Sequence, residues 1–131
     1  NGFIGALTGN VTGNIAGTGR ITHTPTAINA TATATAAQVA TGYITSTSVG
    51  TVTITLPTGT LLGAALGATQ GTVFDLYIDN TAGASVVTVA VATNGILSSG
   101  AADTPGSFGD LTIAAGATGL ARFTLMFSSA T

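Results

Sequence analysis

Few side chains in this chain could support acid–base or metal chemistry. It has a single histidine, His23 in the segment THTPT, and it has no cysteine, glutamate or lysine. A histidine that activates a hydroxyl nucleophile is itself oriented by a third group, and no acidic residue lies near His23 in the sequence. A position in a loop or a cap is therefore the expected role of His23. We predict no catalytic residues and no enzymatic activity.

The acidic residues are all aspartates and form two pairs in the sequence. Asp75 and Asp79 point to one face of an expected strand, roughly 13 Å apart at about 3.3 Å per residue, which is too far for a catalytic carboxylate pair. Solvation of that strand is their expected role. A calcium site that uses Asp103 and Asp110 is an alternative, and so is a metal held by three copies of His23 on a trimer axis. We predict no metal and no cofactor.

Charge is scarce along the whole chain. Charged residues make up 5% of it, against about 25% in ordinary soluble domains. A mean hydropathy of +0.60 with a net charge of −2 indicates a folded chain rather than a disordered one. With two arginines and no lysine it cannot neutralise a run of phosphates, so we predict no nucleic-acid partner. We also predict no membrane partner, because apolar runs such as LLGAALGA are too short and too rich in glycine to span one.

The amino-acid composition also indicates how the protein stays soluble. Threonine, alanine and glycine together account for 69 of the 131 residues. A monomer usually keeps roughly 25–35% of its surface charged. Burial of surface in an assembly is therefore the favoured interpretation, and an extracellular protein with a neutral hydroxyl coat is the alternative.

Residues 1–20, NGFIGALTGNVTGNIAGTGR, carry a four-residue repeat. Glycine and an apolar residue each recur at this spacing, which suits an extended ribbon with a bend in every repeat. Such an arm buries little surface by itself, so we predict that it docks on a partner or threads an oligomer. A flexible linker is the alternative. The predicted assembly residues are Leu7, Val11, Ile15, Gly9, Gly13 and Gly17.

Residues 42–131 carry the strand pattern of a β-domain, and residues 21–41 form a Thr/Ala-rich segment that connects it to the arm. Apolar and small polar residues alternate along several stretches, so each strand has one face for the core. Residues 43–49 are expected to form an edge strand. The residues expected in the core are Val52, Ile54, Leu56, Phe74, Leu76, Ile78, Val87, Val89, Val91, Ala121, Phe123, Leu125 and Phe127.

One short helix is predicted over residues 59–67. Apolar residues there follow helical spacing, Thr58 or Thr60 can cap the first turn, and Gly67 can end the last. Within the Thr/Ala-rich segment, the alternation at Thr31, Thr33 and Thr35 has a β-compatible period. Residues 35–42 could instead form one helical turn, and the sequence leaves both open.

Turn signals connect the expected strands. Residues 79–83 carry the chemistry of a turn that joins two strands into a hairpin, and Asn94 with Gly95 is a type I′ signal. Residues 111–113 and 120–127 are the expected closing strands. The predicted fold class is all-β: an antiparallel sandwich or jelly-roll-like domain with one short helix, preceded by an extended Gly-repeat N-terminal arm.

Two parts of the chain resemble a known group of proteins. The arm GALTGNVTGNIAG resembles the Gly-Asn-Val/Thr tetrads of fibre and appendage proteins of tailed bacteriophages. The phrase GTVTITLPTGTLLGAALGATQGTVFDLYIDNTAGASVVTVAVATNGIL, with GLARFTLMFSS after it, is similar to a β-domain of phage virion proteins. This resemblance implies an all-β domain that decorates a capsid or builds a head or tail fibre, often as a trimer, without catalytic residues.

The predicted function is therefore that of a non-enzymatic virion structural protein on the particle surface. Its expected partners are other copies of itself, most simply in a trimer, and virion proteins such as the major capsid protein. One alternative is a subunit of a secreted or surface filament assembled by strand donation from the arm. A further alternative is a module that binds ice or carbohydrate on threonines such as Thr51, Thr53 and Thr55, which would require the same face on several adjacent strands.

Overall fold

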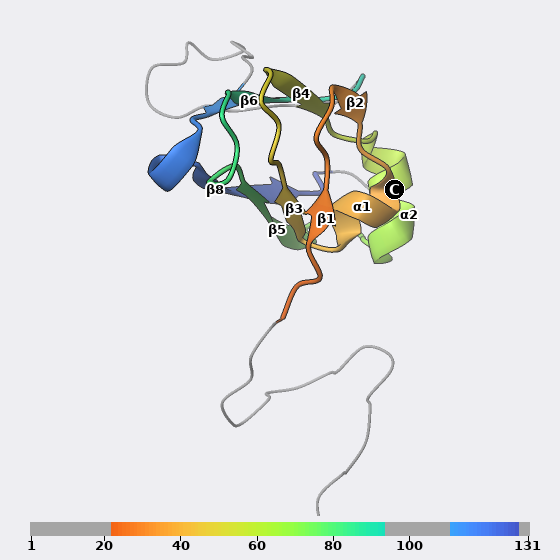
Figure 1. Cartoon of the computed structure of the whole chain (residues 1–131). Coiled ribbons are helices and arrows are strands. Elements are labelled where there is room, and N and C mark those ends of the chain that lie inside the picture. The colour runs from red at the N-terminus through yellow and green to blue at the C-terminus, as the bar shows by residue number, and fades with distance from the viewer. Residues whose placement is uncertain (1–21, 94–110, 129–131) are drawn as a thin grey trace, which may run out of the picture.

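The computed structural model describes residues 22–93 and 111–128. In that part of the chain, strands outweigh helices and form two four-stranded sheets that face each other, with two helices along one side (Figure 1). The first sheet has the order β1 (Thr26–Ala27), β3 (Tyr43–Thr45), β5 (Val73–Asp79) and β8 (Leu120–Met126). The second has the order β2 (Ala32–Thr33), β4 (Val52–Thr55), β6 (Val87–Ala90) and β7 (Leu111–Ile113). The helices are α1 (Ala36–Ala40), α2 (Gly59–Leu66) and the short 3₁₀ helix η2 (Gly116–Thr118).

The chain winds between the two sheets. Each of the first two turns places one strand in the first sheet, one in the second and then a helix, and the third turn adds β5 and β6. Because each turn brings the chain back in the same direction, β1, β3 and β5 run parallel, and so do β2, β4 and β6. After the third turn the direction reverses: β7 pairs antiparallel with β6, and β8 antiparallel with β5.

This winding corrects part of the predicted fold class. The mostly-strand character and the two sheets are confirmed, but both sheets are mixed rather than antiparallel. The predicted hairpin at residues 79–83 is wrong, because the turn carries the chain from β5 in one sheet to β6 in the other. Alternation along a strand specifies which face is buried but not the direction of its neighbour, and for that reason the sequence pattern fitted both arrangements.

The helices partly match the prediction. Gly59–Leu66 is helical as expected, with the Thr58 hydroxyl accepting from the Leu61 amide and Gly67 ending the helix at a left-handed φ of +60°. In the described part of the chain α2 is the one helix of seven or more residues, as expected, and the five-residue α1 adds a shorter one. Thr35 and Gln38 form a reciprocal capping box at its start, so residues 35–42 contain the helical turn that the sequence left open. The alternation before it also forms structure, because β2 lies within it.

The core lies between the sheets and is lined by aligned ladders of side chains. In the first sheet Ile44 lies beside Ile78, and in the second Val52 lies beside Val87, which lies beside Ile113. The expected inward faces of residues 52–56, 74–78, 87–91 and 121–127 are confirmed, with Phe74, Val91, Ala121, Phe123 and Leu125 partly buried against the fully buried cluster. Each helix adds an apolar residue, Val39 from α1 and Leu62 from α2.

Residues 21–41 do more than connect. They supply β1, β2 and α1, so the first winding of the fold lies within them. As a result the strand expected at residues 43–49 is shorter than predicted, and it lies inside the sheet between β1 and β5 rather than at an edge. The arm residues Leu7, Val11, Ile15, Gly9, Gly13 and Gly17, and the expected turn at Asn94 and Gly95, lie outside the described residues.

Asn80 connects the third winding to the reversed strands. Its side chain is fully buried, and its Nδ2 donates to the carbonyls of Ser85, Ile113 and Ala114 at 2.8, 3.3 and 3.0 Å. Its backbone amide donates to the carbonyl of Gly119 at 2.6 Å. One side chain thus holds the start of β6 and the end of β7 against the end of β5.

Candidate functional site

The outward sides of the two sheets differ in chemistry. The outer side of the first sheet is called here the charged face, and its residues are Tyr43, Thr45, Val73, Asp75, Tyr77, Asp79, Leu120, Arg122, Thr124 and Met126. All the charged side chains of the described residues lie on it. The outer side of the second sheet is called the threonine face, and its residues are Thr31, Thr33, Thr53, Thr55, Thr88 and Thr112.

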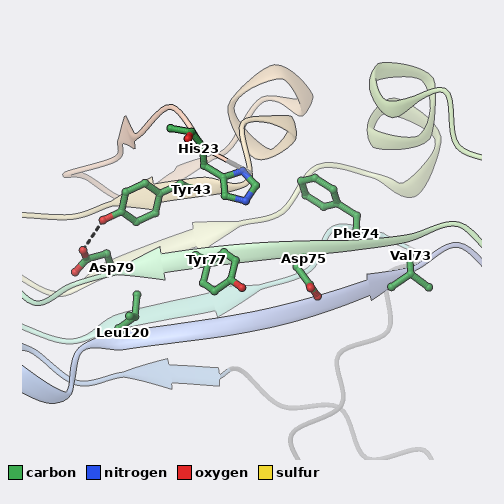
Figure 2. A pocket seen from close by; sticks show the side chains of 9 residues that line it. His23, Tyr43, Val73, Phe74, Asp75, Tyr77, Asp79 and Leu120 are labelled. Atoms are coloured by element: carbon green, nitrogen blue, oxygen red, sulfur yellow. Dashed lines mark hydrogen bonds between the residues drawn. The ribbon is translucent and has the colours of Figure 1, made fainter. Parts of the chain in front are cut away.

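A shallow, open depression of about 890 Å³ lies on the charged face (Figure 2). Its lining includes both tyrosines of the chain, both aspartates of β5 and His23. His23 comes from the segment before β1, and its ring lies against the ring of Tyr77, with the centroids 5.9 Å apart and the planes at 44°. The lining residues thus come from β3, β5, β8 and the first described residues, which are distant in the sequence.

Two contacts fix the orientation of His23. Its Nδ1–H donates to the Thr41 carbonyl at 2.9 Å, so Nε2 is the ring nitrogen left for other partners. The ring also covers Gly42, which has a φ of +75°; a Cβ on Gly42 would lie 2.5 Å from Nδ1. Glycine is therefore required at this position both for the backbone conformation and for the room that the imidazole takes.

Asp79 is held by a small hydrogen-bond network. Tyr43 donates its hydroxyl to Oδ2 at 2.6 Å, and the amide and hydroxyl of Thr81 donate to Oδ1 at 2.9 and 2.6 Å. These bonds favour the ionised form, so the Thr81 hydroxyl first and then Tyr43 lower the pKa of Asp79 below its ordinary 3.8. The same bond from Tyr43, with burial and the charge of Asp79, raises the pKa of Tyr43 above 10.0.

The other charged residues lie along the same two strands. Asp75 accepts from the Thr124 hydroxyl at 2.7 Å, across the pair of β5 and β8. Arg122 is exposed and lies opposite Tyr77, yet it makes no hydrogen bond or ion pair with another described residue. The two aspartates thus accept from neighbouring hydroxyls, and the one cation of this face has no partner among the described residues.

Large apolar side chains are exposed on these strands. Val73 is 59% exposed, Leu120 57% and Met126 65%. Val73 lies directly opposite Met126 at one end of the strand pair, and Leu120 lies opposite Asp79 at the other. Apolar positions thus flank the tyrosines and the charged residues.

The aspartates of the charged face take part in separate hydrogen bonds. Asp75 and Asp79 point to the same side of β5, as predicted, but they engage separate hydroxyls and do not act as a pair. Among the described residues, no group of three or more histidine, aspartate, glutamate or cysteine side chains could hold a metal ion. The calcium alternative at Asp103 and Asp110 lies outside the described residues. No helix in the described part is long and apolar enough to cross a membrane.

Sequence reasoning identified some of this surface and missed the rest. The outward faces of Asp75, Asp79 and Arg122 follow from alternation along the strands, and they lie as expected. That His23 and Tyr43 join them was not predicted, because it depends on which strands are neighbours. Comparison of the chain with protein-family models, with curated proteins and with solved structures gave no match.

The threonine face presents hydroxyls from adjacent strands. Thr53 lies beside Thr88, which lies beside Thr112, and the Thr53 amide donates to the Thr31 hydroxyl at 3.1 Å. A second row contains only Thr33 and Thr55, because the next residue across the sheet, on β6, is Ala90. The repeated threonines that the sequence suggested for one strand thus continue across its neighbours, in one complete row.

Proposed function

We propose that this protein is a non-enzymatic structural subunit of a tailed-phage virion, which assembles as a trimer on the capsid or in a head or tail fibre. The observation that carries the proposal is the charged face, where exposed apolar residues, both tyrosines and an unpaired arginine are collected on one sheet. A surface of this composition is typical of protein contacts rather than of solvent. The phage assignment itself comes from the resemblance of the arm and the core phrase.

The low charge of the chain supports the same proposal. The charged side chains of the described residues lie on a single face. The remaining surface of these residues therefore relies on hydroxyl groups for hydration. Contact between copies through the charged face would remove the apolar residues from water and leave the threonine face outside. A trimer follows from the resemblance, and symmetric closed oligomers are the common outcome for identical subunits.

Sedimentation equilibrium of the full chain at micromolar concentration tests the assembly. A mass three times that of the 12.5 kDa chain is expected, and a monomer would contradict the proposal. The contribution of the arm is tested separately, by replacing Leu7, Val11 and Ile15 with serine and measuring co-sedimentation with the parent phage particle. Burial of each residue is worth about 1.5–3 kcal/mol, so loss of binding with an unchanged fold is expected.

A second candidate is a filament subunit assembled by strand donation. It is favoured by β8, a seven-residue strand whose described neighbour is β5 alone, because such a strand can pair with a donated one. The two candidates differ in how the mass depends on concentration. A closed oligomer reaches a plateau, and a filament continues to grow.

A further inference from the structure

We propose that copies of this chain contact one another through the charged face, with β8 of one copy lying against β5 of the next. This inference rests on the proposed assembly and adds to it the surface and the residues that mediate the contact. Its occupant is a second copy of the chain, and the argument has three parts: exposed apolar residues, charges that complement each other, and a contact geometry that can repeat.

The apolar part comes from both ends of the strand pair. Single exposed apolar residues are ordinary on protein surfaces, but Val73, Leu120 and Met126 are each more than half exposed on two adjacent strands, with Tyr43 and Tyr77 between the ends. Aromatic residues, methionine and arginine are the types enriched at protein contacts. The face thus carries residue types that are enriched at protein contacts, with exposed apolar residues at both ends of the strand pair and charged residues between them.

The charges complement each other between strands. The cation, Arg122, is on β8, and the anions, Asp75 and Asp79, are on β5. Arg122 lies across from Tyr77, between the two aspartates, and no ion pair joins it to either. When β8 of one copy lies over β5 of the next, each unpaired guanidinium meets an acidic strand.

The geometry can repeat from copy to copy. Each contact joins β8 of one copy to β5 of the next. Because every copy has both strands, it can contact one neighbour through β8 and another through β5. Contacts of this kind close into rings when the rotation between copies allows it. A ring of three, with the charged faces turned to the axis, is the form that agrees with the proposed trimer.

Charge reversal tests the contact in the full-length protein. The variants are Arg122→Asp, Asp75→Arg and the two together, compared by sedimentation velocity over a dilution series. Each single reversal places like charges across the contact and should weaken association by about tenfold or more, and the double variant should recover most of it. Thr112→Asp, an exposed change on the threonine face, is the matched control and should associate like the wild type. Circular dichroism confirms that each variant is folded.

The outcomes separate this inference from the proposed function. A wild-type protein that is monomeric would overturn both. A wild-type oligomer that the single reversals leave unchanged, or one that Thr112→Asp weakens equally, would overturn only the contact surface. Single reversals that dissociate the oligomer without recovery in the double variant would show that Arg122 and Asp75 do not face each other, and this too would overturn the inference.

A second pair of variants tests the apolar part. Leu120→Ser with Met126→Ser removes two exposed apolar residues from the charged face, and Val49→Ser with Leu61→Ser removes two that are 86% and 60% exposed elsewhere. The first pair should weaken association by about tenfold or more, since both side chains become buried in the contact, and the second pair should leave it unchanged. Equal effects of the two pairs would contradict the assignment of the surface.

Discussion

The two outer faces of this protein are built on the same winding and have different chemistry. The chain alternates between the sheets, so each turn contributes one strand to each face, and the inward positions of both sheets are apolar. Outward, the first sheet has two tyrosines, two aspartates and an arginine, whereas the second has rows of threonine. Packing between the sheets selects the inward residues, so it does not account for the difference between the outward ones.

The threonine face is suited to water. The Thr31 hydroxyl accepts from the Thr53 amide, and next to this face Thr51 bonds to Ser85. The large apolar residue exposed just before β6 is Val86, at 38%, against 57–65% for Val73, Leu120 and Met126. The charged face combines exposed apolar residues with a cation that has no partner. The charged face therefore exposes more apolar surface than the threonine face.

The largest effect is expected from a residue on which both faces depend. Asn80→Ala removes three hydrogen bonds between the end of β5 and the segments of β6 and β7, and it leaves buried carbonyls without donors. We expect a loss of about 3 kcal/mol or more in the free energy of unfolding, measured by urea denaturation. Asn29→Ala is the control, because Asn29 is exposed and accepts one bond, from the Thr47 amide, so its loss should stay below about 1 kcal/mol. Equal losses would show that Asn80 does not hold the sheets together.

A second prediction concerns the charged face alone. Gly42→Ala places a methyl group in the His23 ring and strains a backbone with a φ of +75°, so a loss of about 2 kcal/mol is expected. Adding His23→Ala removes the clash but not the strain, so the double variant should regain part of the stability. A double variant no more stable than Gly42→Ala would show that the contact with His23 contributes nothing.

The pH dependence of stability sharpens the comparison. The folded pKa of Asp79 is lowered, so its contribution is present above the ordinary value of 3.8 and is lost as the pH falls through the lower folded value. The folded pKa of Tyr43 is raised, so its contribution is present below pH 10.0 and is lost as the pH rises through the higher folded value. Tyr43→Phe should lower the free energy of unfolding by less than about 1 kcal/mol at pH 7, because the pair is near the surface.

The difference in the free energy of unfolding between Tyr43→Phe and the wild type should therefore narrow below about pH 4, where Asp79 becomes protonated. It should also narrow above about pH 10, where Tyr43 loses its proton. Urea titrations at several pH values measure it. A difference that stays constant while Asp79 becomes protonated would show that the bond to Asp79 is not its source.

The smallest effect is expected on the threonine face. Thr88→Val keeps the β-branched shape and removes an outward hydroxyl, so the free energy of unfolding should change by less than about 0.5 kcal/mol, with no change in association. Denaturation and sedimentation measure the two quantities. A weakened oligomer would place the contact on this face.

The sequence predicted the inward faces well because burial follows the period of two within each strand. It also located α2, since Thr58 and Gly67 are local signals at its ends. The direction of neighbouring strands was not predictable in the same way. It depends on how the chain crosses between the sheets after each strand. At the crossing over residues 79–83, the contacts of Asn80 reach Ile113 and Ala114, more than thirty residues further on.

The residues of the candidate site likewise include some that the sequence predicted and some that it did not. Alternation along β5 and β8 showed that Asp75, Asp79 and Arg122 point outward. The meeting of His23 with Tyr77 and of Tyr43 with Asp79 depends on β1, β3 and β5 being neighbours. That order follows from the winding of residues 21–41, which the Thr/Ala-rich sequence did not reveal, because short alternating segments fit a connecting segment as well as edge strands.

The tyrosines provide the most direct test of the claim that the charged face is the contact surface. The chain has two tyrosines and no tryptophan, and both tyrosines lie on this face, so intrinsic fluorescence reports on it alone. Acrylamide quenching is measured while the full-length protein is diluted from the concentration at which sedimentation shows an oligomer to one at which it shows a monomer. The quenching constant should be severalfold lower in the oligomer, because the contact shields both rings. Equal quenching in the two states would show that the copies associate through another surface.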